Sequence, residues 1–176
     1  MPKKSERTRQ RIIEAANRLF YHKGYGQTSF SDVVVAANVP RGNIYYYFKT
    51  KDEILEAAIQ YRLERIRQML ENWNGDYRTP IDRLHRFVEI LSNSADSITR
   101  FGCPMGTLNT ELGKDKGQSQ ALAENLFKVF EAWLSDQFAE LGYAGRAQEL
   151  AMRLMAQGQG ISVMADLQYW SRDDGG

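Results

Sequence analysis

The sequence has little cysteine and histidine and no long apolar run. Its 176 residues include one cysteine and two histidines. The single thiol, Cys103, cannot form a disulfide within the chain, and its simplest setting is a reducing cytoplasm. No grouping of His, Asp and Glu has the spacing of metal ligands, so we expect no metal and no cofactor. No segment reaches the roughly 18 apolar residues of a membrane span, so we expect no membrane partner.

Other patterns are also missing. The chain begins with a basic stretch, but no apolar segment of the kind found in secretory signals follows it. We find neither an internal repeat nor a low-complexity tract. Apolar residues alternate in strand fashion only around residues 33–35, a run too short to predict a strand. What is present is 43% hydrophobic and 26% charged residues, a composition typical of globular proteins.

Charge is divided unevenly along the chain. Residues 1–51 hold ten Lys and Arg against three Asp and Glu, a balance of +7. The other residues hold thirteen basic and nineteen acidic side chains, a balance of −6, so the net charge is only +1. A basic N-terminal part fits a protein that meets a polyanion there. Charge alone would describe a solvated basic surface equally well, and the motif below favours nucleic acid.

Apolar residues recur at helical spacing along the chain, which predicts an all-α fold. In the first half, we expect helices over about residues 5–23, 31–37, 40–48 and 51–73. In the second half, we expect helices over about residues 80–99, 105–112, 119–141 and 147–170, with a bend at 100–104. The fifth helix should bury Ile81, Leu84, Phe87, Val88 and Leu91 on one face.

Residues 32–51 have the pattern of a helix-turn-helix motif. A short apolar helix is followed by a tight turn at residues 37–39, where Asn38 can adopt the left-handed conformation that the turn needs. A second short helix begins at Pro40 and Arg41 and carries three consecutive tyrosines. The second helix of such a motif enters the major groove of DNA. This pattern predicts double-stranded DNA as a partner.

These residues resemble the TetR family of transcriptional repressors. The family pattern has a Thr at the start of the second helix, a turn ending in Val, a Ser-x-Gly, and an apolar-Tyr-x-x-Phe-x-x-Lys run. This chain has Thr28, Val39, Gly42 and the run over residues 44–51 at those positions. Asn38 replaces the usual turn glycine, and a proline replaces the usual serine. The resemblance is specific over residues 8–60 and architectural beyond them.

The resemblance implies two domains. A three-helix DNA-binding domain would cover residues 1–50, and a helical effector-binding and dimerisation domain would cover residues 51–176. The family usually has one more helix after the one expected to end near Trp170, so either that helix is absent or the sequence is shortened. The two long C-terminal helices would form a homodimer. Gly158 and Gly160 either allow a close helix approach or only weaken that helix.

The exposed start of the second motif helix should carry the side chains that read DNA bases. Arginine can pair with guanine, and asparagine with adenine, through two hydrogen bonds. The base-reading candidates are Arg41, Asn43 and Tyr45. The candidates for phosphate contacts, which set register without reading sequence, are Thr28, Tyr46, Tyr47 and Lys51.

Each of three features of this region has two interpretations. Gly42 either lets the backbone approach DNA or relieves packing. The tyrosines either face DNA or form a structural cluster. The basic stretch over residues 3–9 either adds phosphate or minor-groove contacts or is a disordered end. The side chains expected to point inward and hold the motif together are Leu19, Val33, Val34, Ala37, Ile44 and Phe48.

Cys103 lies in the segment F-G-C-P-M-G-T-L-N-T-E-L. This segment resembles the N-ethylmaleimide-responsive (NemR-like) branch of the family, in which a Gly-Cys pair precedes a Leu-x-x-Glu-like helix. A thiol at a helix start is suited to react as a thiolate. The other interpretation is a thiol that only packs. Pro104 removes one nearby N–H, and no lysine follows Lys128, so a lysine of the last helix cannot be the partner of the thiol.

Eight apolar side chains are candidates for the wall of an effector pocket. Aromatic residues and methionines would suit a mostly apolar small molecule, and the same spacing also describes ordinary core. These candidates are Phe87, Leu91, Met105, Leu108, Phe127, Phe130, Met152 and Met155.

The sequence therefore predicts a dimeric, cytoplasmic DNA-binding repressor. A small effector or a thiol-reactive compound would release it from its operator. The alternative is an all-helical small-molecule-binding or scaffold protein that has lost DNA binding. We do not expect an enzyme, because Cys103 is the one plausible nucleophile and no histidine lies near it in the sequence.

Overall fold

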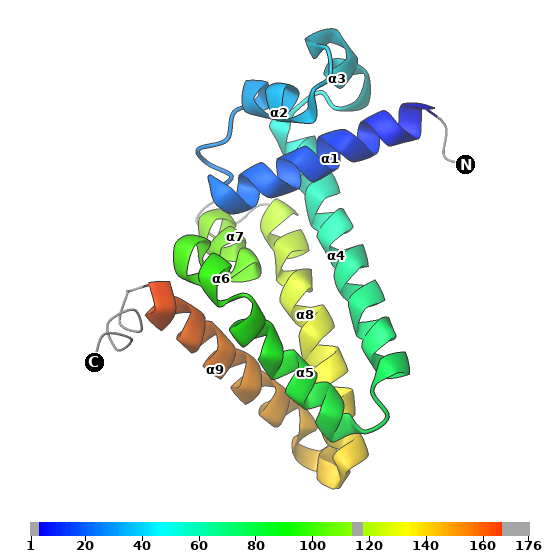
Figure 1. Cartoon of the computed structure of the whole chain (residues 1–176), viewed down its shortest axis with the longest axis vertical. Helices are drawn as coiled ribbons and strands as arrows, with labels where there is room; N and C mark the ends of the chain where they lie inside the picture. The colour runs from blue at the N-terminus through cyan, green and yellow to red at the C-terminus, as the bar shows by residue number, and fades with distance from the viewer. Residues whose placement is uncertain (1–3, 114–117, 167–176) are drawn as a thin grey trace. The chain divides into compact units, whose positions relative to one another are not determined.

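In the computed structural model of the chain, which describes residues 4–113 and 118–166, every regular element is a helix (Figure 1). The prediction of an all-α fold is confirmed. No helix in this described part has the length and apolarity to cross a bilayer. The elements are α1 (Lys4–His22), α2 (Phe30–Ala37), α3 (Arg41–Tyr47), α4 (Lys51–Asp76), α5 (Pro80–Asn93), α6 (Ala95–Phe101), α7 (Pro104–Leu112), α8 (Gln118–Phe138), η1 (Ala139–Tyr143), η2 (Ala144–Arg146) and α9 (Ala147–Asp166).

The helices form two units. Unit 1 comprises Met1–Glu64 and Thr107–Asn125, and unit 2 comprises Arg65–Gly106 and Leu126–Gly176. The expected boundary at residue 50 differs from this division, because the first half of α4 belongs with α1, α2 and α3. The end of α7 and the start of α8 also belong to unit 1.

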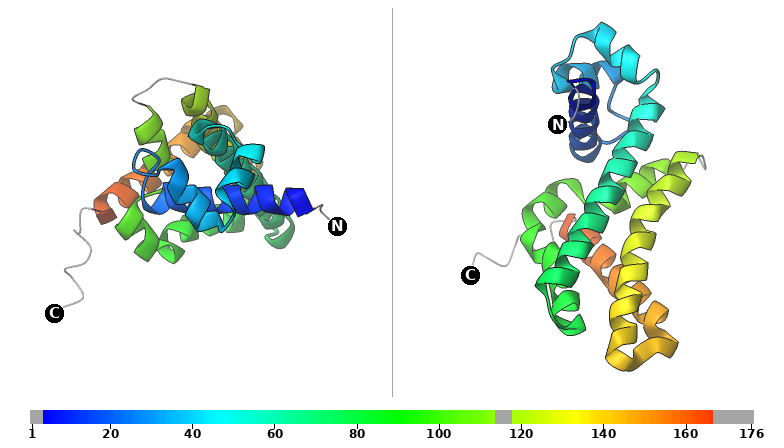
Figure 2. Two further views of the ribbon diagram at one scale, coloured as in Figure 1. Left: turned by 90° about the horizontal axis from the view of Figure 1, so that it is seen from above. Right: turned by 90° about the vertical axis from the view of Figure 1, so that its right-hand side faces the viewer.

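The core of unit 1 joins α1, α2, α3 and the start of α4 (Figures 1 and 2). Helix α1 buries residues at positions that share one helical face. Of the side chains expected to point inward in the motif, four are buried and two, Leu19 and Val34, are half-buried. The main core residues are Ile12, Ala16, Phe20, Val33, Ala37, Ile44, Phe48, Ile54, Leu55 and Ile59.

The turn of the motif has the predicted conformation. Asn38 lies in the left-handed region, with φ 49° and ψ 53°, and its N–H donates to the carbonyl of Val35. Helix α2 begins with a capping box, in which the Ser29 hydroxyl accepts from the Asp32 N–H and the Asp32 carboxylate accepts from the Ser29 N–H. The capping box thus gives partners to two N–H groups that have none within the helix, which explains why the helix starts at Phe30 rather than one residue later.

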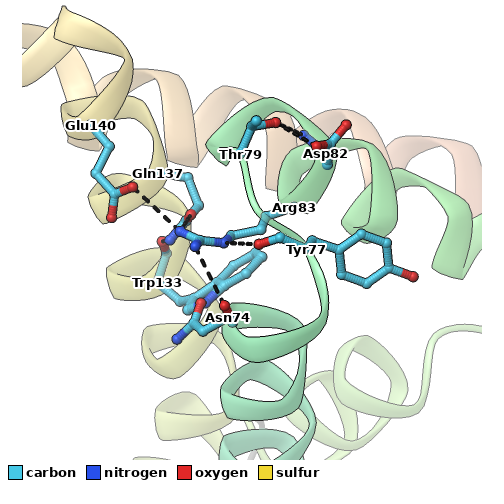
Figure 3. Close-up of polar contacts among 8 residues, drawn as sticks. All are labelled: Asn74, Tyr77, Thr79, Asp82, Arg83, Trp133, Gln137 and Glu140. Carbon is cyan, nitrogen blue, oxygen red and sulfur yellow. Dashed lines mark hydrogen bonds and ion pairs between the residues drawn. The ribbon is translucent and has the colours of Figure 1, made fainter.

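Unit 2 is built around two tryptophans. The rings of Trp73 and Trp133 meet edge to face, with centroids 5.7 Å apart, and the Trp133 indole N–H donates to Asn74. Beside them, Arg83 of α5 donates to the Tyr77 carbonyl at 3.0 Å and to Gln137 of α8 at 3.1 Å (Figure 3). These contacts fix the connection between α4 and α5 against α8.

Three details differ from the sequence-based expectation. The single helix expected over residues 80–99 is divided into α5 and α6, and the bend expected from residue 100 begins at Gly102, where φ is 71°. Helix α8 ends at Phe138, and the chain then kinks at Gly142, where φ is 92°. The expected apolar face of α5 was partly wrong: Leu84 is buried, but Ile81 and Val88, seven residues apart on another face, are 46% and 44% exposed. The reason is register, because Leu84 and Phe87 turn toward the tryptophan core.

Candidate nucleic-acid interface

Helix α3 buries one face and exposes the other. Ile44 is fully buried, and Phe48 at the end of the helix is 3% exposed. The other positions of the helix are exposed except for Tyr47, which is half-buried, and Tyr46 is 76% exposed. The three base-reading candidates all lie on this exposed side: Arg41, Asn43 and Tyr45. Side chains of the types that can pair with base edges are therefore accessible on α3.

The three tyrosines are held in different ways. The Tyr45 ring stacks on the Phe30 ring, with centroids 5.0 Å apart and planes inclined by 20°. Tyr46 meets Tyr47 edge to face, with centroids also 5.0 Å apart. Tyr47 is half-buried, whereas the other two are exposed. Each ring therefore has an intramolecular aromatic neighbour that limits its orientations, and Tyr46 extends furthest into solvent.

Gly42 is not required by packing. A Cβ built on this residue would have no other atom within 4 Å, and the residue lies in the regular first turn of α3. The interpretation that Gly42 relieves a packing clash is therefore not supported, because no atom lies close enough to clash. An approach of the backbone to DNA stays a prediction.

The phosphate candidates Thr28 and Lys51 are both tied to the loop between α1 and α2. Thr28 is 1% exposed, and its hydroxyl donates to the Gly24 carbonyl at 2.7 Å. The Lys51 ammonium donates to the Tyr25 carbonyl at 3.0 Å and lies 4.0 Å from the centre of the Tyr25 ring. The structure does not group Thr28 with the exposed side chains. Sequence reasoning missed Tyr25, for which the only local signal is its position between two glycines.

Asp32 of the capping box also pairs with a cation, Lys23. The carboxyl group of Asp32 has its pKa lowered from 3.8 to about 2, first by the Lys23 hydrogen bond and then by the backbone and hydroxyl of Ser29. The Lys23 ammonium lies 2.7 Å from the Asp32 carboxylate.

The basic stretch over residues 4–9 forms the first turns of α1 rather than a disordered tail, and the Arg9 guanidinium lies 5.1 Å from the Phe48 ring centre. Residue 3 lies outside the described residues.

In unit 2, Cys103 directly precedes α7 and is half-buried. The Gln159 amide of α9 donates to its sulfur at 3.3 Å. A Cβ on Gly106 would lie 2.6 Å from the Gln159 Oε1 atom, so the glycine leaves the room that this amide occupies. Helix α9 thus brings an amide rather than a lysine to the thiol. Sequence reasoning missed Gln159, because nothing local links it to residue 103.

The predicted pocket residues do not share one environment. Four of them pack in the tryptophan core: Phe87, Met105, Phe130 and Met155. The ring centroids of Phe87 and Phe130 are 5.5 Å apart. Three others differ from these and from each other: Leu108 is buried in unit 1, Phe127 is half-buried, and Met152 is 51% exposed. Of Leu91 only the backbone, in α5, is described.

An open hollow in unit 2 uses none of these eight residues. Its volume is about 330 Å³, and it lies along α4. The residues that line it are Arg65, Gln68, Met69, Asn72, Trp73 and Asp76. Within residues 4–113 and 118–166, no group of three or more His, Cys, Asp or Glu side chains is arranged to hold a metal ion.

Comparison with known proteins agrees with the geometry of the motif. The sequence pattern of the family described as "Bacterial regulatory proteins, tetR family" matches residues 12–58. An HTH-type transcriptional regulator from the lacX 3' region of Lactococcus lactis subsp. lactis is 32% identical over 132 residues, which cover 73% of this chain and 63% of that protein. The HTH-type regulator LmrA of Bacillus subtilis is 27% identical over 148 residues, covering 82% of this chain and 76% of its own length.

The chain belongs to the TetR family.

Solved structures extend the likeness of this TetR-family regulator beyond the matched segment. The reduced form of Escherichia coli NemR superposes with a TM-score of 0.80 over 92% of this chain and 88% of that chain. The sequence identity is 20%, so the comparison speaks for the fold alone. The arrangement of an N-terminal helix-turn-helix followed by a helical C-terminal part is therefore the fold of the family.

Proposed function

We propose that this TetR-family regulator is a dimeric repressor that reads operator DNA with α3 and leaves it when an effector acts on the C-terminal helices. One observation carries the proposal. Helix α3 is anchored by Ile44 and Phe48 while Arg41, Asn43 and Tyr46 face solvent. A helix exposed in this way offers the guanidinium and amide groups that pair with bases in the major groove.

The proposed contacts fall into two classes. Arg41, Asn43 and Tyr45 would meet base edges, and Gly42 would allow the backbone to come close. Tyr46, Tyr47 and Lys51 would contact phosphates. Thr28 would act through the loop, because its buried hydroxyl already donates to Gly24.

A second copy of the chain would complete the operator-binding form. Two recognition helices must meet successive half-sites on one face of the duplex. Helix α9 supports such a dimer, because it exposes Met152, Ile161, Val163 and Met164 to solvent in the single chain. A monomeric mass at micromolar concentration in solution would contradict this part of the proposal.

The signal is proposed to act at Cys103 as a thiol-reactive compound, as in the NemR-like branch. The thiol is half-buried rather than fully enclosed, and the Gln159 amide donates to the sulfur that would carry the thiolate charge. The thiolate is the nucleophile in reactions with electrophiles. Modification would change the equilibrium between a DNA-binding and a released state.

DNA binding is tested with fragments of the DNA upstream of the protein's own gene. Fluorescence anisotropy should give a specific complex that weakens steeply as salt rises. Arg41→Ala should reduce discrimination at one base position, whereas Tyr46→Ala should weaken binding to all sequences alike. Arg78→Ala, which removes an exposed arginine of unit 2, is the matched control. If no fragment binds at low salt, the proposal fails, and the alternative of a small-molecule-binding or scaffold protein that has lost DNA binding is favoured.

Sensing is tested on the same complex with N-ethylmaleimide. The wild type should dissociate after modification of one thiol per chain, measured by intact mass, and Cys103→Ser should stay bound. Equal dissociation of both proteins would rule out Cys103 as the site of the signal.

A further inference from the structure

Glu111, near the end of α7, holds the loop between α1 and α2. One carboxylate oxygen accepts a hydrogen bond from the Tyr25 N–H at 2.9 Å, and the other accepts from the Gly26 N–H at 3.4 Å. The glutamate is half-buried and stands 86 residues from Tyr25 in the sequence. All these residues belong to unit 1. An ionised carboxylate on two successive backbone N–H groups makes the stronger, charge-assisted kind of hydrogen bond.

The loop is shaped around this carboxylate. Gly24 has φ +86°, a conformation that side chains disfavour, and a Cβ there would lie 2.8 Å from the Glu111 Oε1 atom. A Cβ on Gly26 would lie 3.7 Å from the same oxygen. Glycines on both sides of Tyr25 therefore let the backbone close around the glutamate.

Tyr25 also contacts the first residues of α4. Its carbonyl accepts from the Lys51 ammonium, which also lies over its ring, and its hydroxyl donates to Asp52. The Tyr25 ring meets Phe20 of the core edge to face, with centroids 5.3 Å apart. Tyr25 thus links two residues: its N–H donates to the Glu111 carboxylate, and its carbonyl accepts from the Lys51 ammonium. An ammonium has three donors, so a bond to Tyr25 leaves capacity for a phosphate.

We propose that Glu111 is a positioning residue for DNA binding, which sets the place of the Lys51 ammonium through Tyr25. The inference rests on the proposed function and adds the route by which α7 controls the phosphate contact. Helix α7 starts directly after Cys103 and is continuous to Leu112. Glu111 lies in the last turn of this helix, and loss of its carboxylate should release Tyr25 and free Lys51 from its DNA-binding position.

The test compares operator binding by the wild type, Glu111→Ala, Glu111→Gln and the control Glu124→Ala, all as full chains. Glu124 is an exposed acid of the same unit whose side chain accepts from Gln120 on its own helix, so its removal changes charge equally. Glu111→Ala should bind the operator about tenfold more weakly, a size common for coupling between sites. Glu111→Gln should fall between it and the wild type, because one of its two terminal atoms is a donor that faces a backbone N–H.

Two readouts separate positioning from a merely structural effect. In Glu111→Ala the salt dependence of binding should lose about one phosphate contact, as in Lys51→Ala. The double variant with Lys51→Ala should bind no more weakly than Lys51→Ala alone. The inference would be overturned if Glu111→Ala kept the salt dependence of the wild type and its loss of affinity added to that of Lys51→Ala. It would also be overturned if Glu111→Ala bound the operator with the affinity of the wild type.

The two proposals fail in different ways. A wild type that binds no DNA ends the proposed function, whereas a binding wild type matched by its Glu111 variants ends only this inference. If Glu111→Ala does not fold, as judged by circular dichroism, Glu111→Gln decides, and its binding the operator like the wild type would overturn the inference.

Discussion

The guanidinium of Arg11 closes the turn at Asn38. Its Nη2 atom donates to the Asn38 carbonyl and to the Ala37 carbonyl, both at 2.8 Å. Arg11 lies on α1, so the arginine ties the first helix to the point at which the chain leaves α2 for α3. Carbonyls at a helix end have no partner within the helix, and a nearby cation also favours the negative end of the helix dipole.

Loss of that cation should destabilise unit 1. We expect Arg11→Ala to lower the free energy of unfolding by about 1–2 kcal/mol, because two carbonyls lose a charged donor. Urea unfolding followed by circular dichroism measures the change. Arg18→Ala, which removes an exposed arginine of the same helix, should change it by less than about 0.5 kcal/mol. Equal stability of the two variants would contradict the role given to Arg11.

Acid should weaken the capping box of α2. The folded-state pKa of Asp32, about 2, lies below its ordinary value of 3.8, so the ionised form is stabilised by folding. This contribution is fully present above pH 3.8 and is lost as the pH falls toward 2. The stability difference between the wild type and Asp32→Asn should therefore shrink over this range. Lys23→Met should bring the carboxyl pKa closer to 3.8, measured by NMR titration, because the lysine is the largest cause of the shift.

Gly42→Ala should separate folding from DNA binding. A methyl group at this position meets no atom of the chain, and alanine favours a helix, so thermal stability should stay the same or rise by up to about 1 kcal/mol. Operator affinity should fall about tenfold or more if the backbone comes close to DNA. Gly75→Ala in α4, where a Cβ is equally free of neighbours, should leave affinity unchanged. Undiminished binding by Gly42→Ala would refute a close approach.

Arg83 should be important for the stability of unit 2 (Figure 3). Arg83→Met removes the donor to the Tyr77 carbonyl and to Gln137, whose side chain is almost fully buried. We expect a loss of about 2–3 kcal/mol in the free energy of unfolding, since polar groups are left without this partner. Arg146→Met breaks the exposed ion pair with Glu149 and should leave the free energy of unfolding almost unchanged, because solvent screens such pairs. Similar urea midpoints for both variants would contradict the assignment.

Gln159 should tune the reactivity of Cys103. Gln159→Leu keeps the bulk of the side chain but removes the donor to the sulfur, so we expect alkylation by N-ethylmaleimide near pH 7 to slow about threefold. Gln157→Leu, at an exposed position of the same helix, is the control. Intact mass against time gives the rates. Faster or unchanged alkylation of Gln159→Leu would show that the amide does not promote the reaction.

Local chemistry explains which expectations from the sequence succeeded. The helical spacing, the left-handed Asn38 and the inward Ile44 and Phe48 depend on residues only a few positions apart. The cap of α2 is equally local, because Ser29 and Asp32 are three residues apart. The face of α5 was partly wrong, because an amphipathic pattern does not say which neighbour a helix will meet.

The all-α fold, the helix-turn-helix and the residue types exposed on α3 follow from backbone preference and short-range periodicity. The tertiary structure alone decided three long-range contacts: Glu111 with Tyr25, Gln159 with Cys103, and Arg83 with Gln137. Their partners are 86, 56 and 54 residues apart, so no local pattern pairs them. They arise from the packing of helices distant in sequence, which orients side chains that are individually unremarkable polar residues.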